Sequence, residues 1–169
     1  MTVAIRPLQR ADDRQTFRSG DEALDLYFHR YAGQNRFRHH IGVSYVAVDG
    51  NRVLGFVTLS PASLDAGDLP SGRKMPPYPV PVLRLARLAV DQTARALGVG
   101  RALLRFVIEL AERMAAEVGC VGIVVDAKSG AEGFYRRHGF VPLELLEGSA
   151  PQRPEPMPMF LALGSVPRR

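Results

Sequence analysis

At 169 residues the chain has the length of one domain, 1–169, with a single buried core, and its 46% hydrophobic and 23% charged residues exclude an intrinsically disordered chain. No apolar stretch approaches the roughly 20 residues of a membrane-spanning helix, and the N-terminus lacks the basic-then-apolar order of a signal peptide. The only cysteine, Cys120, lies in an apolar run, so we expect a soluble cytoplasmic protein with Cys120 in its core.

The net charge of +5 comes almost entirely from arginine, because Lys74 and Lys128 are the only lysines. Arginine side chains match phosphate groups in two-point geometry better than ammonium groups do. The arginine content therefore fits a polyanionic partner, such as a nucleotide cofactor or RNA, and it fits a bias of genome composition equally well.

Helical signals extend over residues 10–38 and are interrupted at Ser19 and Gly20. Asp21 is placed to cap a second helix, because its side chain can accept hydrogen bonds from the first free N–H groups. The apolar residues of this helix fit one buried stripe: Leu24, Leu26, Tyr27, Phe28 and Tyr31.

The middle of the chain reads as β-structure around a long loop. Residues 43–60 hold two β-rich runs joined at Asp49-Gly50, a strong turn pair, which predicts a hairpin. Residues 61–82 hold many of the prolines, and we expect a long loop there, on or near the working surface. Residues 83–90 then predict a strand.

A long amphipathic helix is predicted over residues 99–118, ended by Gly119. Its apolar residues recur at spacings of three and four: Leu103, Leu104, Val107, Leu110, Ala111, Met114 and Val118. Residues 120–127 form a continuous apolar run, which is typical of a strand buried on both faces.

The C-terminal part predicts one more helix and two strands. Ser129 is expected to cap a short helix that Gly139 ends. Residues 140–145 and 159–163 would be the last strands, separated by a proline-rich loop at 150–158. Alternation of strands and helices in this half indicates a βαβ crossover with a parallel pair, so the fold class is mixed α/β.

Two glycines stand in the segment 95–100, RALGVG, where the long helix should begin. Such a turn points several backbone N–H groups at one spot, where the helix dipole also favours negative charge. No Lys-Ser/Thr follows the turn, so it is not a P-loop, and the third glycine of the dinucleotide fingerprint is missing. Taken alone, Gly98 and Gly100 fit a phosphate site or simple turn punctuation.

The pattern Arg95-x-x-Gly98-x-Gly100 after RLARLAVD resembles the acetyl-CoA pyrophosphate loop of the GNAT acyltransferase superfamily. The segment 133–140, GFYRRHGF, resembles the later helix of that superfamily, where a tyrosine faces the thioester. Four further segments make the chain similar to the toxin branch of GNAT proteins: FRSGDEALDLYFHRYAGQ (17–34), RLAVD (87–91), VVDA (124–127) and MFLAL (159–163). Toxins of this branch acetylate the aminoacyl end of charged tRNA and are neutralised by ribbon-helix-helix antitoxins.

This resemblance implies a GNAT fold, in which two central parallel strands of a mixed sheet splay apart and flanking helices cover the sheet. It also implies a homodimer. The residues it assigns to the pantetheine are Leu88, Ala89 and Val90. The residues it assigns to the pyrophosphate are Arg95, Ala96, Leu97, Gly98, Val99, Gly100 and Arg101. The alternative for Arg95 is an ordinary exposed arginine at a helix start.

Tyr135 is the candidate catalytic residue. Attack of a neutral amine on a thioester must place a proton on the departing sulfur, and a phenol can donate that proton or hold the forming thiolate by a hydrogen bond. The alternative is that Tyr135, like Phe134, is a core aromatic residue on a short helix.

No carboxylate in the 83–90 strand offers a general base. Asp91 and Asp126 are the nearest acids, and we expect Asp91 to cap the following loop and Asp126 to orient backbone at a strand end. An α-amino group titrates near ~8, far below the ~10.4 of lysine, so it needs less help to lose its proton. The missing base therefore favours an α-amine as acceptor.

Residues 29–40, HRYAGQNRFRHH, interleave basic and aromatic side chains, a pattern suited to RNA contact or to a solvated end of an amphipathic helix. The candidate substrate-binding residues are Arg30, Arg36 and Arg38. No cysteine or carboxylate joins the nearby histidines at ligand spacing, so we expect no metal.

These observations favour an acetyl-CoA-dependent N-acetyltransferase, a toxin that acetylates the α-amino group of aminoacyl-tRNA by direct attack of the amine on the thioester. One alternative is a GNAT enzyme for a small amine, a peptide or a protein N-terminus. The other alternative belongs to a different class, a non-catalytic acyl-CoA-binding or partner-binding module.

Overall fold

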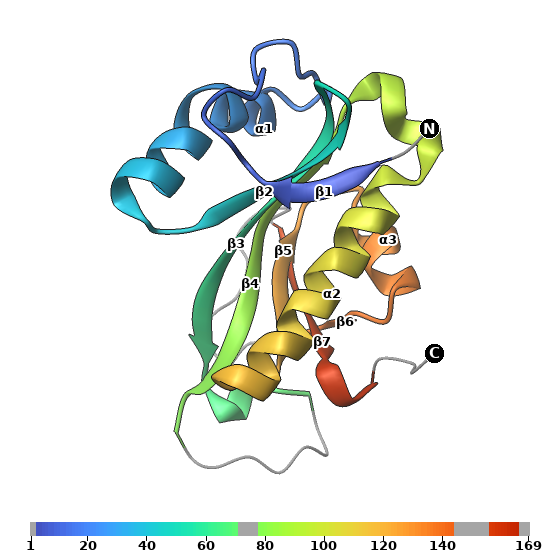
Figure 1. The fold of residues 1–169 in the computed structure, drawn as a ribbon. Helices are drawn as coiled ribbons and strands as arrows, with labels where there is room; N and C mark the ends of the chain where they lie inside the picture. The colour runs from blue at the N-terminus through green and yellow to red at the C-terminus, as the bar shows by residue number, and fades with distance from the viewer. Residues whose placement is uncertain (1–2, 71–77, 144–155, 166–169) are drawn as a thin grey trace. The chain divides into compact units, whose positions relative to one another are not determined.

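The structure is a computed structural model that describes residues 3–70, 78–143 and 156–165. Its strands are β1 (Ala4–Pro7), β2 (Val43–Asp49), β3 (Arg52–Leu64), β4 (Val80–Val90), β5 (Gly122–Ala127), β6 (Val141–Pro142) and β7 (Met157–Ala162) (Figure 1). Its α-helices are α1 (Glu22–Leu26), α2 (Val99–Glu117) and α3 (Glu132–Arg137). Its π or 3-10 segments are η1 (Tyr27–Tyr31), η2 (Gln34–His39), η3 (Ala66–Asp68), η4 (Gln92–Leu97) and η5 (Leu163–Ser165).

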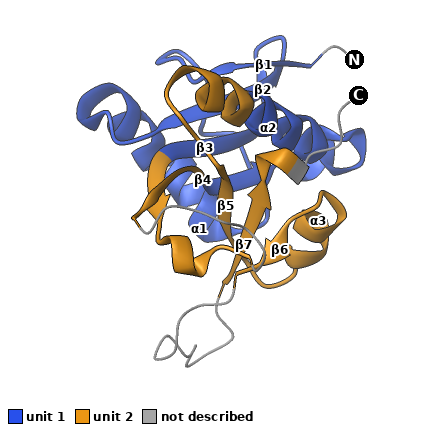
Figure 2. Ribbon diagram, turned by 90° about the horizontal axis from the view of Figure 1, so that it is seen from below, with its two compact units in different colours: residues 1–60, 85–109 blue, residues 61–84, 110–169 orange. Residues whose placement is uncertain are grey.

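The chain divides into two compact units, shown in Figure 2. Unit 1 comprises residues 1–60 and 85–109, and unit 2 comprises residues 61–84 and 110–169. Strands β3 and β4 contribute residues to both units. The strand order is β1-β2-β3-β4 in unit 1 and β3-β4-β5-β7-β6 in unit 2. With β5 parallel to β4, the predicted mixed α/β class is confirmed.

Unit 1 is built on the predicted hairpin. Strands β2 and β3 pair antiparallel, with Val46 opposite Phe56, and β1 pairs antiparallel with β2. Gly50 adopts φ +60 at the turn, as an Asp-Gly pair favours. Three phenylalanines form the centre of the core: the rings of Phe28 and Phe56 stack at 4.4 Å, and Phe17 meets Phe28 edge-on at 5.0 Å.

The N-terminal helix begins as predicted, because the Asp21 side chain accepts hydrogen bonds from the N–H groups of Ala23 and Leu24. It then widens into the π segments η1 and η2 and ends only at His39, at the upper left of Figure 1. The predicted stripe is wrong in part, because Leu26 and Tyr31 are 46% and 45% exposed. Tyr31 ends the π segment η1, whose wider turns rotate side chains away from the face that a spacing of three and four would keep; Leu26 is the last residue of α1.

Unit 2 has its own core of Leu69, Val80, Leu143 and Phe160. Strand β5 pairs antiparallel with β7, with Val125 opposite Met159, and β6 pairs with β7. Gly122 of β5 lets the ring of Phe160 on β7 lie against the strand, because a Cβ at this position would come 2.3 Å from that ring. Cys120 is buried, as expected.

The predicted helix 99–118 is confirmed as α2, and the short helix predicted over residues 130–138 is confirmed as α3, which begins at Glu132. Gly119 and Gly139 follow them with φ of +102 and +95. After α3, the N–H of Gly139 donates to the carbonyl of Arg136 and that of Phe140 to the carbonyl of Tyr135, both at 3.1 Å, which is a Schellman motif. Within the described residues, no helix is long and apolar enough to cross a membrane.

Several predicted boundaries are wrong. The loop expected at 61–82 is shorter, because β3 continues to Leu64 and β4 begins at Val80. Proline lacks only the N–H donor, so the carbonyl of Pro81 still accepts a hydrogen bond from Val121 at 2.9 Å. The strand expected at 140–145 is only β6 in its described part, and residues 144–145 and most of the 150–158 loop lie outside the described residues.

The predicted cap at Ser129 is also wrong. Helix α3 begins after Ala131, which offers no side-chain cap. The chain reaches the helix through a backbone turn instead, in which the N–H of Ala131 donates to the carbonyl of Lys128 at 2.9 Å.

Candidate functional site

The segment Arg95–Gly100, which we call the glycine turn, lies between β4 and α2 as predicted. The 3-10 helix η4 ends at Gly98, which adopts φ +75, and α2 begins at Val99. A side chain at Gly98 would meet no atom within 4 Å, so the turn is open on that side. The first N–H groups of α2 have no acceptor within the helix, and they stand at the positive end of its dipole. This arrangement suits an anionic phosphate group.

A cavity of about 460 Å³ adjoins the glycine turn and is lined by Gly98, Arg101, Ala102, Arg105, Phe106, Glu109 and Ile5. The guanidinium groups of Arg101 and Arg105 belong to exposed side chains one helical turn apart. Both can therefore reach a bound anion. The residues present fit a phosphate-bearing ligand at this end of α2.

The strand residues expected to pair with pantetheine lie at the C-terminal end of β4. Ala89 is buried in the unit 1 core, and Leu88 and Val90 are half-buried. Gly55 allows this strand to lie close, because a Cβ there would come 3.0 Å from the carbonyl oxygen of Ala89. The structure thus places the predicted pantetheine strand and the glycine turn in the same unit.

Arg95 has a partner within the protein. Its guanidinium donates a hydrogen bond to the backbone carbonyl of Ser19, from a turn far away in sequence. This contact uses the side chain of Arg95 to hold the turn in place, and it leaves the backbone of the glycine turn free to meet a ligand.

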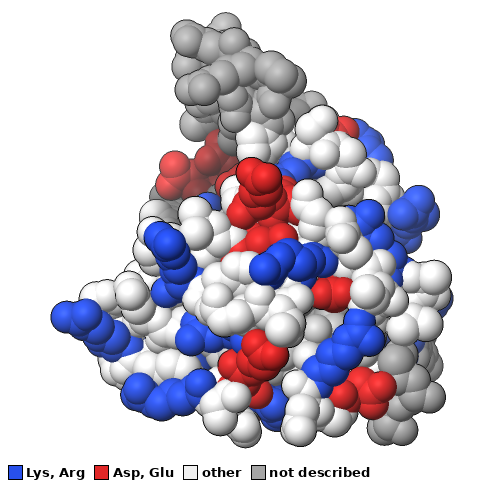
Figure 3. All heavy atoms as spheres, turned by 90° about the horizontal axis from the view of Figure 1, so that it is seen from above, with Lys and Arg blue, Asp and Glu red and all other residues white. Residues whose placement is uncertain are grey.

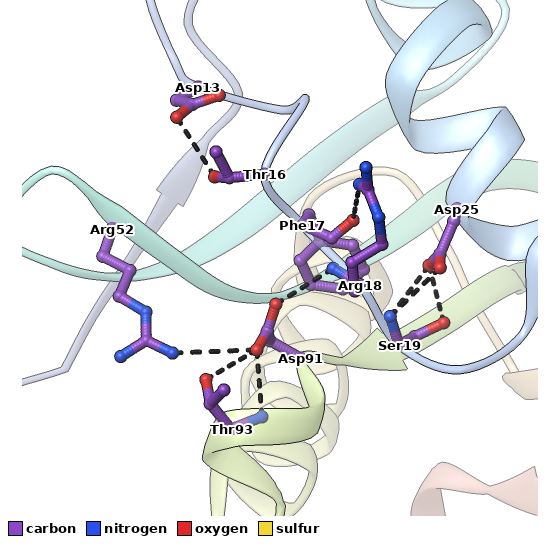
Figure 4. Close-up of polar contacts among 9 residues, drawn as sticks. All are labelled: Asp13, Thr16, Phe17, Arg18, Ser19, Asp25, Arg52, Asp91 and Thr93. Atoms are coloured by element: carbon purple, nitrogen blue, oxygen red, sulfur yellow. Dashed lines mark hydrogen bonds and ion pairs between the residues drawn. The ribbon is translucent and has the colours of Figure 1, made fainter.

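Asp91 caps η4 as predicted, with its carboxylate accepting from the N–H of Thr93 at 3.0 Å. It also accepts from the Thr93 hydroxyl at 2.6 Å and from the N–H of Arg18 at 3.0 Å, and it lies 3.7 Å from the guanidinium of Arg52 (Figure 4). Burial opposes ionisation, but the hydrogen bonds from Thr93 and Arg18 outweigh it and hold the pKa of Asp91 below its usual value.

The prediction for Asp126 is wrong. Its carboxylate contacts the guanidinium of Arg84 at 3.4 Å, and both side chains are about half exposed, at 51% and 52%. Asp126 points outward within β5, where alternate residues of a strand face opposite sides, and it forms a surface ion pair instead of a backbone contact.

Tyr135 lies on α3 in unit 2 and is buried, with 5% of its surface exposed. Its ring meets those of Phe134 and Phe140 edge-on at 5.2 and 5.4 Å. Burial raises the pKa of Tyr135 to about 12. Phe134, expected in the core, is only half-buried, because the helix turns Tyr135 inward in its place.

A second cavity, of about 620 Å³, lies along the N-terminal helix; we call it the arginine groove. It is lined by Arg10, Arg14, Arg30, Gly33, Gln34, Phe37 and Arg38. Basic side chains stand at the left of the molecule seen from above, the side on which η1 and η2 lie in Figure 1 (Figure 3). Two predicted residues, Arg30 and Arg38, line this groove.

The third predicted residue, Arg36, is not among the lining residues, although its guanidinium lies 5.3 Å from the centre of the Phe37 ring. Its Nε donates to the carbonyl of Leu8 at 3.1 Å. Two arginines that sequence reasoning missed, Arg10 and Arg14, line the groove instead. The guanidinium of Arg10 lies 4.6 Å from the centre of the Phe37 ring. Both come from residues 10–18, where the helical signals are wrong because the structure has no helix there, so a helical spacing does not place them.

The groove has little opposing charge. No acidic residue occurs between Asp25 and Asp49. Nearby, Asp12 is engaged by Arg6 through two hydrogen bonds of 2.7 and 2.9 Å, and Asp13 accepts from the Thr16 hydroxyl at 3.1 Å. Among the described residues, no group of three or more His, Cys, Asp or Glu side chains could hold a metal ion.

Comparison with known proteins identifies the family of the chain. Residues 40–142 match the family described as acetyltransferase (GNAT) domain. The chain is 36% identical over 139 residues to a tRNA-acetylating toxin of Mycobacterium tuberculosis, a match that spans 81% of this chain and 83% of the toxin.

Solved structures agree at the level of the fold. AtaT complexed with acetyl-methionyl-tRNAfMet is similar with a TM-score of 0.83 and 27% identity, over 97% of this chain and 96% of that one. A crystal structure of AtaTR bound with AcCoA is similar with a TM-score of 0.77 and 27% identity, over 96% and 95% of the two chains. The chain belongs to the GNAT family of acetyl-CoA-dependent acetyltransferases.

Proposed function

We propose that this acetyltransferase is a toxin that transfers the acetyl group of acetyl-CoA to the α-amino group of aminoacyl-tRNA. The observation that carries the choice of acceptor is the arginine groove, whose four arginines form no ion pair with a described residue. A small neutral amine would gain nothing from such a surface, whereas the phosphates of an RNA would. Similarity to a tRNA-acetylating toxin supports the same acceptor.

Acetyl-CoA supplies the acetyl thioester. The backbone N–H groups at Gly98, Val99, Gly100 and Arg101 would hold its pyrophosphate, and backbone groups of Leu88, Ala89 and Val90 would pair with the pantetheine amides. Open space at Gly98 supports this assignment, because any side chain there would fill the approach to the N–H groups.

Tyr135 would act on the sulfur atom that leaves when the thioester is broken. The amine nitrogen forms a bond to the thioester carbon, the carbon–sulfur bond breaks, and the sulfur leaves with negative charge. A thiol ionises near ~8.5, so a phenol whose pKa is raised to about 12 holds its own proton more tightly than the thiolate would. Tyr135 therefore stabilises the forming thiolate by a hydrogen bond, and the proton lost by the amine can complete the thiol through solvent.

The protonated α-amino group of the acceptor would lose its proton without help from a protein carboxylate. Asp91 is committed to backbone and side-chain donors, and Asp126 is paired with Arg84. An α-amine near ~8 is partly neutral at physiological pH. This chemistry favours an aminoacyl ester over a lysine side chain as acceptor.

The toxin assignment includes partners. A ribbon-helix-helix antitoxin would neutralise the enzyme, and the active form would be a homodimer, as the resemblance to the toxin branch implies. Expression of the chain alone should arrest growth, and light scattering of the purified protein should give the mass of a dimer.

The acceptor is tested by incubating the enzyme with labelled acetyl-CoA and a panel of charged tRNA, the same tRNA after deacylation, free amino acids and a peptide. Label should enter only charged tRNA, and nuclease digestion should release it as N-acetyl-aminoacyl-adenosine. Label in the free amino acids or the peptide, with none in charged tRNA, would replace this function with that of a small-molecule or N-terminal acetyltransferase.

A further inference from the structure

The turn Phe17–Gly20 connects the two binding regions of unit 1, and we call it the bridging turn. On one side it contacts η4, which leads directly into the glycine turn. On the other side it contacts α1, which leads into the helix that lines the arginine groove (Figure 4).

Contacts with η4 hold both backbone groups of Arg18. Its N–H donates to the carboxylate of Asp91 at 3.0 Å, and its carbonyl accepts from the N–H of Gln92 at 2.8 Å. The next carbonyl, that of Ser19, accepts from the guanidinium of Arg95. The carboxylate of Asp91 also caps η4 through Thr93, so one buried side chain fixes the bridging turn and the start of η4 together.

Contacts with α1 hold Ser19. Its N–H and its hydroxyl both donate to the buried carboxylate of Asp25, at 3.0 and 2.7 Å. Two carboxylates on opposite sides, Asp91 and Asp25, therefore fix two successive residues of the bridging turn.

Gly20 completes this arrangement. It adopts φ +95, and a Cβ there would lie 2.8 Å from Nε2 of Gln92 and 2.9 Å from the guanidinium of Arg95. A side chain at Gly20 would therefore displace the ends of the Gln92 and Arg95 side chains, and the positive φ itself favours glycine.

We infer that Asp91 is a positioning residue that couples the two substrate sites, by holding the bridging turn against η4 so that acetyl-CoA at the glycine turn orders the helix that lines the arginine groove. The RNA half of this coupling rests on the proposed function. Its acetyl-CoA half does not, because the contacts between the bridging turn and η4 stand whatever the acceptor is.

Two variants perturb this arrangement from opposite sides. In Asp91→Asn the amide nitrogen faces either the Arg18 N–H or the Thr93 N–H, so one hydrogen bond must break. Gly20→Ala forces Gln92 and Arg95 to move. Gly50→Ala is the matched control, because Gly50 also has a positive φ, of +60, but has open space around it in the hairpin turn.

Calorimetry with acetyl-CoA gives the first readout. We expect Asp91→Asn and Gly20→Ala to weaken acetyl-CoA binding by about tenfold, as loss of a hydrogen bond to a charged group implies, and Gly50→Ala to stay within about twofold of wild type. All three variants can lower the unfolding temperature, so affinity and not stability is decisive. Affinities within twofold of wild type in both folded variants would overturn the role of Asp91.

Amide exchange gives the second readout, and it needs no RNA. Acetyl-CoA should slow exchange at Arg18 and Ser19 in the wild type, and this protection should disappear in Asp91→Asn. Unchanged exchange in the wild type would overturn the coupling.

The third readout is the affinity for deacylated tRNA with and without CoA. CoA should tighten RNA binding several-fold in the wild type and leave it unchanged in Asp91→Asn. If tRNA does not bind at all, the proposed acceptor fails while the first two readouts still decide the role of Asp91. If tRNA binds with equal affinity in both conditions, the coupling fails and the acceptor stands.

Discussion

In the proposed site the glycine turn would meet its ligand through backbone groups, and the side chains around the turn hold that backbone in place. Asp91 caps η4, Arg95 reaches the carbonyl of Ser19, and Gly98 leaves one side open. In the arginine groove the ligand-facing groups are the side chains themselves, and Arg30 and Arg38 are exposed. The first region is preorganised for one ligand, whereas the second offers charge to an extended partner.

This difference sets what each region contributes. Fixed N–H groups at a helix start give a strong, short-ranged interaction that one added side chain can block. Exposed arginines each give a modest interaction that is spread over several phosphates and weakened by salt. Substitutions in the two regions should therefore differ in size and in salt dependence.

Gly98→Glu should have the largest effect and abolish acetyl-CoA binding, because it puts a side chain and a negative charge at the phosphate site. The fold should survive, since the space around Gly98 is open, although a side chain at φ +75 costs roughly 1–2 kcal/mol. Calorimetry measures the loss. Gly50→Glu is the control, with φ +60 and open space, and should bind normally. Unchanged affinity in a folded Gly98→Glu variant would remove the glycine turn from the site.

Tyr135→Phe should reduce kcat by about 10²–10³-fold and leave the affinity for acetyl-CoA unchanged. Loss of the hydroxyl alone should leave the ring packing against Phe134 and Phe140 intact. Tyr45→Phe removes a phenol from β2 as a control and should keep full activity. Turnover within a few-fold of wild type would return Tyr135 to a purely structural role.

The pH dependence of kcat should rise about tenfold per pH unit below the pKa of the acceptor amine, near ~8, and then level off. Burial raises the pKa of Tyr135 to about 12, so its phenol should keep its proton between pH 8 and 10. A falling limb between pH 8 and 10 that is absent in Tyr135→Phe would contradict this, since it would show Tyr135 losing its proton there.

Arg38→Ala should have the smallest effect, a several-fold increase in KM for charged tRNA with the KM for acetyl-CoA unchanged. The log–log salt slope should decrease by about 0.7–0.9 for each phosphate that the variant no longer binds. Arg36→Ala provides the comparison within the same helix, because its Nε donates to Leu8. It should lower the unfolding temperature and leave the salt slope unchanged, and the reverse result would exchange the two roles.

The two regions also differ in how far the sequence predicts them. The glycine turn is predictable because a positive φ at Gly98 and a helix start at Val99 are local properties of the chain. The groove is predicted only in part, because Arg10 and Arg14 come from an irregular segment that tertiary packing brings beside η2. Arg36 stays a prediction: it is not among the residues that line the groove, and its Nε donates to the carbonyl of Leu8.

The contacts of the bridging turn cannot be predicted from the sequence either, because tertiary packing brings their residues together. The cap by Asp91 is local and expected, but its bond to Arg18 joins residues 73 positions apart. Nothing in the spacing of either residue signals the other. Long-range polar contacts of this kind become visible only once the fold is known.

The account is tested most directly by the salt dependence of kcat/KM, measured in parallel on charged tRNA and on the methyl ester of the same amino acid. Both substrates present the same α-amine to the acetyl thioester, but only charged tRNA can engage the arginine groove. For charged tRNA the account predicts a steep fall of log kcat/KM against log salt concentration, with a slope of about −2 or steeper if three arginines contact phosphates. For the ester it predicts a nearly flat line. Equal slopes for the two substrates would show that the groove does not bind the acceptor and would contradict the proposed function.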